Sequence, residues 1–532
     1  MRTIDKNPVV KTRSGKGRGR LAGGVVDENE MTAGVNETLN RWPTVGLAVG
    51  VVRDGRLAFF HGHGLADIAS HTPVTEDTVF RIASITKTFT AIAVMQLWEQ
   101  GLIDLDAPAN DYLRAYKLVP AKASFRPATV RHLLTHTAGI REVLHPSGLL
   151  RMRDLGETVP FGQDVPSLAE YYRGGLRIDA EPGSRFMYTD HGFATLGQIV
   201  EDVSGMPLKR YLREHIFEPL GMTSTDLVRA ARVQSHLATG YNLRRNGARA
   251  VTDYEVVTVG GGGIYSSTRD MARYMAALLG GGANEYGQVL KPETMTMMFA
   301  PHYRPDTRMA GNGLAFFRFN LGGHLAVEHD GILPGFDSQI FLAPDDGVGV
   351  MAFANGARQG FHWLTPEVGR LLKHLLGIPD EVTRSDVPQH PEIWDDLCGW
   401  YHFSAYLTDP AKLALGAGVE VFVRRGQLMM RVLGPLPVLY RGFPLHPDDD
   451  TDPYIFRIDL STFGIGTGRV IFSREDGVGT TAVHFEFGPM SFQKQPDSKN
   501  PRLWATGALG ALAVAATAAV VRRPRGRSHK EG

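Results

Sequence analysis

Ser84 and Lys87 are the residues of this chain whose types and spacing most directly suggest chemistry. Residues three positions apart lie on one face of a helix, so the Lys87 amine can reach the Ser84 hydroxyl. A serine alcohol is a weak nucleophile until a neighbouring base takes its proton, and a neutral lysine amine can be that base. The pair therefore predicts a nucleophilic serine, although the S-x-x-K pattern alone is common and needs support from its context.

The residues that follow must position this pair. The segment from Ile85 to Gln100 is apolar almost all round, which is typical of a buried helix, and Gly101 suits its C-terminal cap. A serine at the start of such a helix has free backbone N–H groups and the positive end of the helix dipole beside it. We therefore expect Ser84 at the N-terminus of a buried helix.

Three later motifs occur with the first in a fixed order. The sequence F-R-I-A-S-I-T-K contains the pair, and the others are Leu133–Gly139 (LLTHTAG), Glu181–Asp190 (EPGSRFMYTD) and His329–Gly331, followed by Pro334–Phe336. Together they resemble the serine β-lactamase and penicillin-binding-protein superfamily, in particular its class C and esterase-like branch. The resemblance covers about Asn36 to Gly377. It implies an α+β fold, with an antiparallel sheet flanked by helices.

The resemblance also implies catalytic roles. Ser84 would attack a carbonyl and form an acyl-enzyme, Lys87 would take the serine proton, and Tyr188 would pass it to the leaving group and then activate water. The backbone N–H groups of Ser84 and Ile332 would form the oxyanion hole. Gly331 would be needed because a side chain there would block the substrate backbone.

Two positions depart from the family pattern. Asp190 replaces an asparagine, and an ionised carboxylate near Lys87 would favour the charged ammonium, so either Asp190 points elsewhere or the tyrosine does more of the base work. The third motif is His329-Asp330-Gly331, where β-lactamases have Lys-Thr-Gly to bind the drug's carboxylate. Histidine is mostly neutral at pH 7 and Asp330 adds a negative charge. Substrates that carry a carboxylate should therefore bind poorly.

These features predict a serine hydrolase that acts on a small-molecule or peptide ester or amide. A D-amino-acid peptidase, a penicillin-binding protein and a weak β-lactamase are alternatives. A non-catalytic scaffold that retains the fold is the alternative from another class, because Asp190 would weaken the base. We expect no cofactor and no metal. His132 and His136 have a zinc-like spacing without the glutamate of H-E-x-x-H, and no Gly-Lys-Ser/Thr follows the glycines 260–263.

Composition limits the remaining possibilities. The 532 residues exceed one ordinary core, so two or three domains are expected. A net charge of +1 does not indicate a nucleic-acid partner. Cys398 is the only cysteine, which excludes an internal disulfide.

The chain divides into segments of different character. Residues 1–30 are basic, lack the apolar run of a signal peptide and are expected to be disordered. Residues 36–377 form the predicted catalytic domain, with hairpin-like strands at both ends and helical segments between them. A linker rich in proline and aspartate (378–395) leads to short alternating strands over 396–493, which resemble a small lipocalin-like β-barrel.

The C-terminal segment carries a different signal. Residues 504–521 are uncharged, and as a helix they would span roughly 27 Å, near the lower limit for crossing a bilayer. The basic tail 522–532 favours an enzyme that faces the cell exterior by the positive-inside rule. The absence of an export signal leaves the cytoplasmic side open. We thus expect membrane association through one C-terminal helix, while the oligomeric state is not predicted.

Overall fold

The structure is a computed structural model that describes residues 26–142, 157–244, 246–357, 363–379, 383–384, 386–403, 417–434, 440–461, 466–486 and 490–502. Most of the segment expected to be disordered, the candidate membrane helix and the basic tail lie outside these residues. Across the described ranges, no helix combines the length and the apolar character that crossing a bilayer requires.

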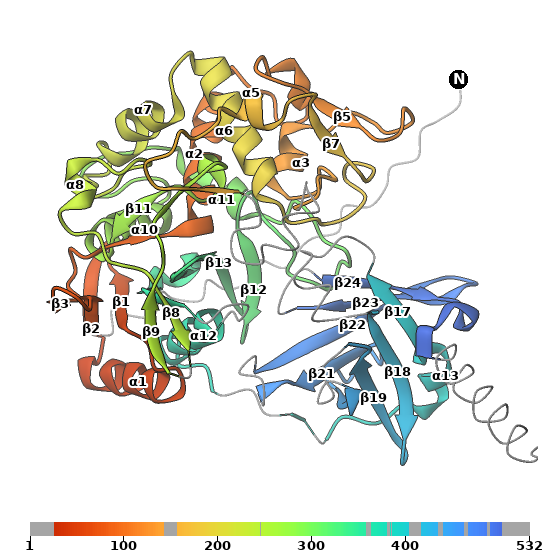
Figure 1. The fold of residues 1–532 in the computed structure, drawn as a ribbon. Coiled ribbons are helices and arrows are strands. Elements are labelled where there is room, and N and C mark those ends of the chain that lie inside the picture. Colours follow the sequence, from red (N-terminus) through yellow and green to blue (C-terminus); the bar gives the residue numbers. More distant parts are fainter. Residues whose placement is uncertain are drawn as a thin grey trace, which may run out of the picture.

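A seven-stranded antiparallel sheet forms the centre of the larger part of the molecule (Figure 1). Its strand order is β12-β13-β14-β15-β1-β2-β3, so the first strands of the chain pair with the last ones of this domain. The strands are β1 (Gly46–Arg53), β2 (Arg56–Asp67), β3 (Thr72–Pro73), β12 (Phe317–Leu321), β13 (His324–Leu333), β14 (Phe336–Ala343) and β15 (Val348–Ala354). The α+β architecture predicted from the two terminal hairpins is confirmed.

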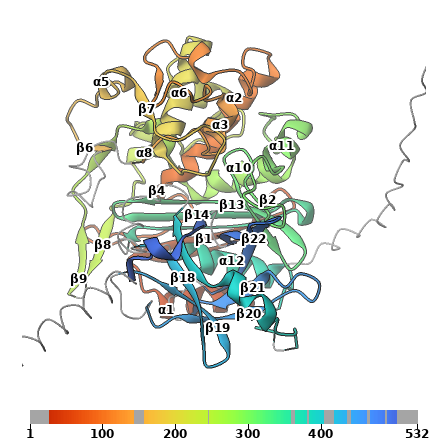
Figure 2. The same ribbon diagram turned by 90° about the vertical axis from the view of Figure 1, so that its right-hand side faces the viewer.

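The sheet is buried on both faces because its strands are apolar at nearly every position. Leu47 and Val49 of β1 pack against α1 (Glu28–Arg41) and α12 (Leu364–Leu375), whereas Ala48 faces the core of the helical region. Successive side chains of a strand point to opposite faces, which produces these two cores. Figure 2 shows the helices on one side of the sheet and α1 with α12 on the other.

The predicted buried helix is present as α2 (Thr86–Glu99), and twelve of its fourteen residues are buried. It packs with α6 (Asp190–Ser204) in the helical region. The other helices are α3 (Val130–Leu134), α5 (Leu168–Tyr171), α7 (Leu208–Leu212), α8 (Ala231–Gln234), α9 (Val259–Gly262), α10 (Thr268–Leu279), α11 (Pro292–Phe299) and α13 (Trp394–Leu397). Short strands complete this part: β4 (Val79–Arg81), β5 (Leu118–Pro120), β6 (Thr158–Pro160), β7 (Leu176–Ile178), β8 (Tyr241–Arg244), β9 (Gly247–Ala250), β10 (Tyr254–Val256), β11 (Tyr265–Ser267) and β16 (Gly356–Ala357).

The C-terminal strands close into a barrel, as the alternating pattern predicted. The barrel consists of β17 (Gly399–Phe403), β18 (Val419–Arg424), β19 (Gln427–Val432), β20 (Phe443–Pro447), β21 (Ile455–Asp459), β22 (Thr467–Glu475), β23 (Gly479–Phe485) and β24 (Met490–Gln495). Its interior is filled by apolar side chains such as Leu428, Phe456 and Val470.

One loop of the larger, sheet-containing part of the molecule anchors the barrel. Arg308 donates to Asp452 at 2.8 Å and to the Phe472 carbonyl at 2.7 Å, while Ser473 of the barrel donates to Asp306. This loop precedes β12, which borders the candidate site described below. The barrel therefore supports the segment that leads into the site.

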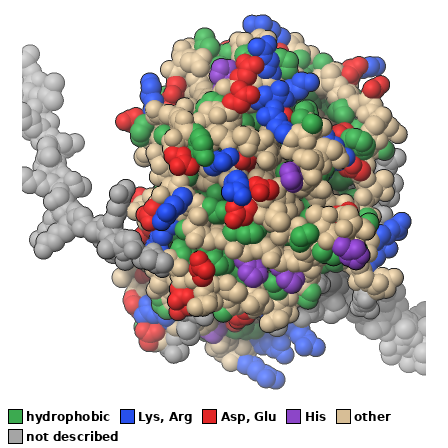
Figure 3. Space-filling view, turned by 90° about the vertical axis from the view of Figure 1, so that its left-hand side faces the viewer, with side chains coloured by type: hydrophobic (Ala, Val, Ile, Leu, Met, Phe, Trp, Pro, Cys, Tyr) green, Lys and Arg blue, Asp and Glu red, His purple; other side chains and the backbone are tan. Residues whose placement is uncertain are grey.

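The outer surface carries charges of both signs. Figure 3 shows basic and acidic side chains interspersed over one face of the molecule. This mixture matches the net charge of +1.

Candidate active site

Ser84 lies in the short 3₁₀ turn η1 (Ala83–Ile85), between β4 and α2. Ala83 has a φ of +48°, a left-handed conformation that is uncommon for a residue other than glycine. Such local strain often marks a functional site. The turn places the Ser84 hydroxyl 2.8 Å from the Lys87 amine, so the two residues of the first motif are in hydrogen-bond contact.

The Lys87 amine is fully buried and has a complete set of partners. It contacts Ser84, donates to the Gly261 carbonyl at 2.8 Å and forms an ion pair with Asp190. The Asp190 carboxylate therefore points at Lys87 and not elsewhere. Gly261 belongs to the glycine run that forms α9, and its role was not recognised from the sequence.

Tyr188 directly precedes Thr189, the N-cap of α6, and its buried phenol lies near the Ser84 hydroxyl. Its ring centroid lies 4.9 Å from the Lys87 amine. Burial raises the pKa of the Tyr188 phenol well above its ordinary value, and the nearby carboxylates of Asp190 and Asp330 add to this effect. The phenol is therefore protonated at neutral pH, and in the free enzyme it can donate a proton but is not a ready base.

His136 of the second motif supports Tyr188. The two rings stack at 4.4 Å, and the His136 Nδ1 accepts a hydrogen bond from the Thr189 backbone N–H at 3.2 Å. Burial, aided by the charge of Lys87, lowers the pKa of His136 well below its ordinary value, so it is neutral. His132 instead accepts from the Thr129 N–H at the start of α3. Both histidines thus make local structural hydrogen bonds.

The third motif lies on β13, next to the nucleophile. His329 is buried and donates through Nδ1 to the Asp330 carbonyl at 2.6 Å. Burial, with the charge of Lys87, lowers the pKa of His329 to about 4, so the ring is neutral at pH 7. Ile332 follows Gly331 on the same strand, and its side chain is 39% exposed.

The structure gives a steric reason for glycine at position 331 within the protein itself. A Cβ there would lie 2.5 Å from the Ile82 carbonyl oxygen and 2.9 Å from the Ala83 Cβ. Both residues directly precede Ser84. The absence of a side chain therefore lets β13 approach the turn that carries the nucleophile.

Two glutamates that the sequence analysis missed complete the surroundings of Lys87. The Glu142 carboxylate accepts from the Asp190 backbone N–H at 2.8 Å, and the Glu157 carboxylate accepts from the Thr258 hydroxyl at 3.2 Å. Burial and the Asp190 charge raise the pKa of Glu142 to about 8. Burial and the charge of Glu142 raise that of Glu157 well above its ordinary value. Each is an isolated glutamate in a loop-like stretch, without a motif to reveal it.

The carboxylate oxygens of Glu142, Glu157 and Asp190 lie within 4.8 Å of one another, a spacing that could suit a metal ion. Lys87 already provides the positive charge at this place, through its ion pair with Asp190. Because Glu142 and Glu157 have raised pKa values and are protonated, the Lys87 ammonium alone balances the charge of the Asp190 carboxylate. We therefore assign no metal ion to this cluster.

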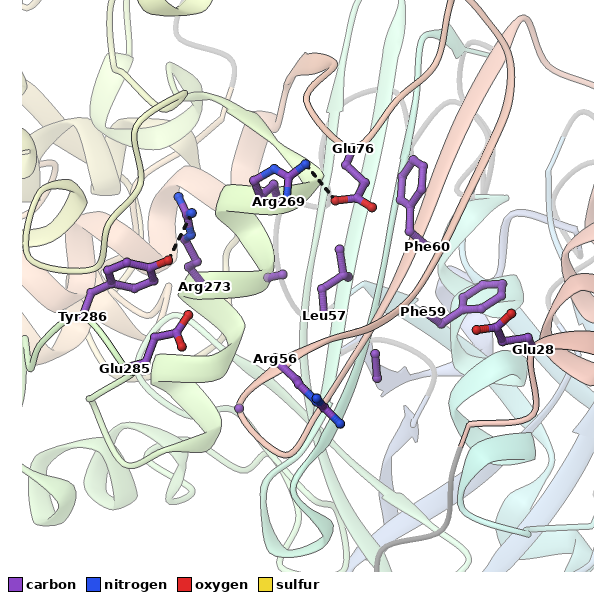
Figure 4. Close-up of a pocket in the computed structure, with 13 residues that line it drawn as sticks. Glu28, Arg56, Leu57, Phe59, Phe60, Glu76, Arg269, Arg273, Glu285 and Tyr286 are labelled. Atoms are coloured by element: carbon purple, nitrogen blue, oxygen red, sulfur yellow. Dashed lines mark hydrogen bonds and ion pairs between the residues drawn. The ribbon is translucent and has the colours of Figure 1, made fainter.

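A separate cavity of about 480 Å³ lies between the β1–β2 hairpin and α10 (Figure 4). Two of its arginines are paired within the protein: Arg269 with Glu76 at 3.1 Å, and Arg273 with the Tyr286 hydroxyl at 3.3 Å. The residues of the candidate site do not line it. We therefore assign it no part in the chemistry.

Comparison with known proteins gives four informative matches. The beta-lactamase family model matches residues 37–400. The mitochondrial serine beta-lactamase-like protein LACTB of Homo sapiens is 27% identical over 331 residues, which cover 50% of this chain and 60% of that protein. Esterase EstB of Burkholderia gladioli is 34% identical over 200 residues, which cover 37% of this chain and 50% of that protein. The octameric penicillin-binding protein homologue from Pyrococcus abyssi shares the fold, with a TM-score of 0.57 and 24% identity over 88% of this chain and 100% of that chain. These matches confirm the resemblance drawn from the four motifs.

Proposed function

Because the chain belongs to the beta-lactamase family of serine hydrolases, we propose that it hydrolyses an ester or amide through an acyl intermediate on Ser84. The observation that carries this proposal is the convergence of three groups. The Ser84 hydroxyl lies 2.8 Å from the Lys87 amine, and the Tyr188 phenol lies beside both, with its ring centroid 4.9 Å from that amine. These are the contacts that a proton needs to leave the serine and reach a leaving group.

The steps follow from the charges of these groups. Ser84 Oγ attacks the carbonyl carbon while its proton passes to the neutral amine of Lys87. The protonated Tyr188 donates to the leaving group, and the resulting phenolate recovers a proton from Lys87. Water then attacks the acyl-enzyme and gives up its proton along the same path in reverse. The backbone N–H groups of Ser84 and Ile332 stabilise the oxyanion, and the loss of one such donor typically costs about 2.7–4 kcal/mol.

The charges around the site support substrates without a carboxylate. Glu142 and Glu157 have raised pKa values and are protonated beside the Lys87–Asp190 pair, whereas Asp330 lies beside the neutral His329. A substrate carboxylate would meet Asp330 without the permanent cation that a Lys-Thr-Gly motif supplies. This arrangement favours neutral or amine-bearing esters and amides over β-lactam antibiotics.

Aromatic rings beside the nucleophile support an apolar acyl group. Phe317 stacks on Tyr188 at 6.4 Å and contacts Phe186 at 6.1 Å. Such rings bind apolar groups through their large surface. The esterase name of EstB agrees with this choice, so an ester with a moderate apolar acyl group is our preferred substrate class.

The Lys87–Asp190 contact favours one rival interpretation, a scaffold without turnover, because a lysine held as an ammonium is not a base. A fluorophosphonate probe separates the two. We expect covalent mass on Ser84 that is lost in Ser84→Ala, and faster hydrolysis of short acyl esters than of penicillins. An unlabelled but folded protein would support the scaffold. Efficient nitrocefin turnover would show that the interpretation of the His329-Asp330 site is wrong.

A further inference from the structure

Three carboxyl groups from separate parts of the chain meet beside Lys87. Asp190 is the first residue of α6, Glu142 lies beyond α3, and Glu157 directly precedes β6. Glu142 is 8% exposed and Glu157 is 7% exposed, so this carboxyl cluster is largely shielded from water. Its oxygens lie within 4.8 Å of one another.

The three carboxyl groups of the cluster cannot all be ionised at once. If all three carboxyls were ionised beside one ammonium, the buried site would carry two uncompensated negative charges, which a low-dielectric interior strongly disfavours. The carboxyl oxygens of Glu157 and Asp190 lie within 4.8 Å of each other, so two ionised carboxylates at this place would repel. Two protons on the three acids make the cluster and Lys87 neutral together.

We propose that Glu142 and Glu157 are positioning residues that hold these two protons, so that Lys87 can transfer its own proton to Asp190 and become a free amine. The inference rests on the function proposed above. The transfer converts an ammonium and a carboxylate into an amine and a carboxylic acid. No proton leaves the site and its net charge does not change. It thereby explains how Asp190 can contact the lysine in a working enzyme.

The surroundings of Glu142 determine what its ionisation would do. The titratable groups that face the cluster are Lys87 from α2, Asp190 and His191 from α6, Tyr172 directly after α5, Tyr188 and Glu157. The His191 ring contacts the Glu142 carbonyl and the Tyr172 hydroxyl, each at 2.8 Å, and the Glu157 carboxyl at 3.3 Å. Loss of the Glu142 proton adds a negative charge beside Lys87, which favours the ammonium form of the lysine. Lys87 then stays an ammonium, and the reaction stops.

The first experiment measures kcat/KM for a short acyl ester against pH. The wild-type protein should lose activity about tenfold per pH unit once Glu142 ionises, above a pH of about 8. Glu142→Gln keeps an oxygen to accept from the Asp190 N–H but cannot ionise. In this variant the alkaline limb, the fall of kcat/KM at high pH, should begin at a pH at least one unit higher. An alkaline limb at the same pH in this variant and in the wild type would overturn the proposal.

Glu328→Gln is the matched control. Glu328 is also buried, and burial, with the Asp330 charge, raises its pKa well above the ordinary value, but it hydrogen-bonds to Gln339 and not to the cluster. Its replacement should leave the alkaline limb unchanged. An equal shift in this control would overturn the assignment of the limb to the cluster. Should Glu142→Gln fail to fold, Glu157→Gln tests the same limb.

A second experiment detects the protonated glutamate directly, without measuring turnover. The infrared difference spectrum of wild type minus Glu142→Gln (or minus Glu157→Gln, should the first not fold) should show the carbonyl band of a protonated carboxylic acid at pH 7. For Glu142 this band should disappear as the pH rises past 9. Absence of the band at pH 7 overturns the proposal even if the enzyme is active. If the wild type shows the band but neither fluorophosphonate labelling nor turnover, the proposed function fails while the protonated cluster stands.

Discussion

A single methyl group at Gly331 should disable the site by pushing β13 away from the turn that carries Ser84. Gly331→Ala would place its Cβ 2.5 Å from the Ile82 carbonyl oxygen, and the Ala83 Cβ and the Ser338 hydroxyl also lie too close. Backbone and a hydrogen-bonded serine surround the new atom, so no flexible side chain can move aside. Instead β13 must withdraw from the turn that holds Ser84.

The size of this displacement follows from the contacts. Ordinary contact begins at 3.4 Å, so the Cβ and the Ile82 oxygen must separate by about 0.9 Å. Overpacking of this kind costs about 1–3 kcal/mol of stability. A misplacement near 1 Å between reacting groups can cost about 100-fold in rate. We expect kcat to fall by about that factor, because the Ile332 N–H moves away from the oxyanion.

The assay combines ester turnover, the rate of fluorophosphonate labelling and urea denaturation. Gly369→Ala is a suitable control, because a Cβ at this position of α12 makes only ordinary 3.7 Å contacts with Phe341. The control should keep full activity and gain up to about 1 kcal/mol of helix propensity. Wild-type turnover and stability in Gly331→Ala would refute the claim that this close approach positions the site.

Three further predictions concern the barrel, pH and the C-terminal segment. Arg308→Ala removes the contacts with Asp452 and should cost about 2 kcal/mol, read as a lower Tm that Arg308→Lys partly restores; an unchanged Tm contradicts the anchoring role. Burial lowers the pKa of His484 to about 4, so below its ordinary value of about 6.5 the unfolded chain binds more protons than the folded one. The free energy of unfolding should then fall by up to about 3 kcal/mol between pH 6.5 and pH 4, and His484→Gln should flatten this slope in urea titrations; equal slopes would contradict it. If residues 504–521 insert into bilayers, the full chain should float with lipid vesicles and a chain that ends at Arg502 should not; equal flotation of both would show the prediction to be wrong.

The sequence predicts those parts of the fold whose local signals agree with their surroundings. The Asp54-Gly55 pair has positive φ values of 52° and 72°, as a two-residue hairpin turn requires, and apolar runs flank it on both sides. In the barrel, the alternating pattern predicts short strands over 396–493, but it is weak in β20 and β24. Two prolines in β20 and the polar sequence of β24 conceal their pairing, which depends on closure of the barrel.

The site residues likewise divide into those that local spacing predicts and those that only the folded chain brings together. Spacing alone predicts that Ser84 and Lys87 meet, since both belong to one turn of the chain. Glu142 and Glu157 could not be found this way, because what brings them to Lys87 is the folding of distant loops. For Gly331 the motif predicts room for a substrate, whereas its close contacts with the Ile82 carbonyl and Ala83 could not be foreseen from the sequence. Residue types along a chain do not reveal which backbone segments approach each other.

Asp190 and Glu142 should prove energetically coupled, because each determines the charge of the other. In Asp190→Asn, Lys87 loses its ion-pair partner, and the repulsion that helps to keep Glu142 protonated disappears. Glu142 should then ionise and become the counter-ion of Lys87. Adding Glu142→Gln to Asp190→Asn should therefore cost more stability than adding it to the wild type, with a coupling of about 0.5–3 kcal/mol in a double-mutant cycle. Additive free energies of unfolding at pH 7 would mean that the two acids do not share the lysine's charge.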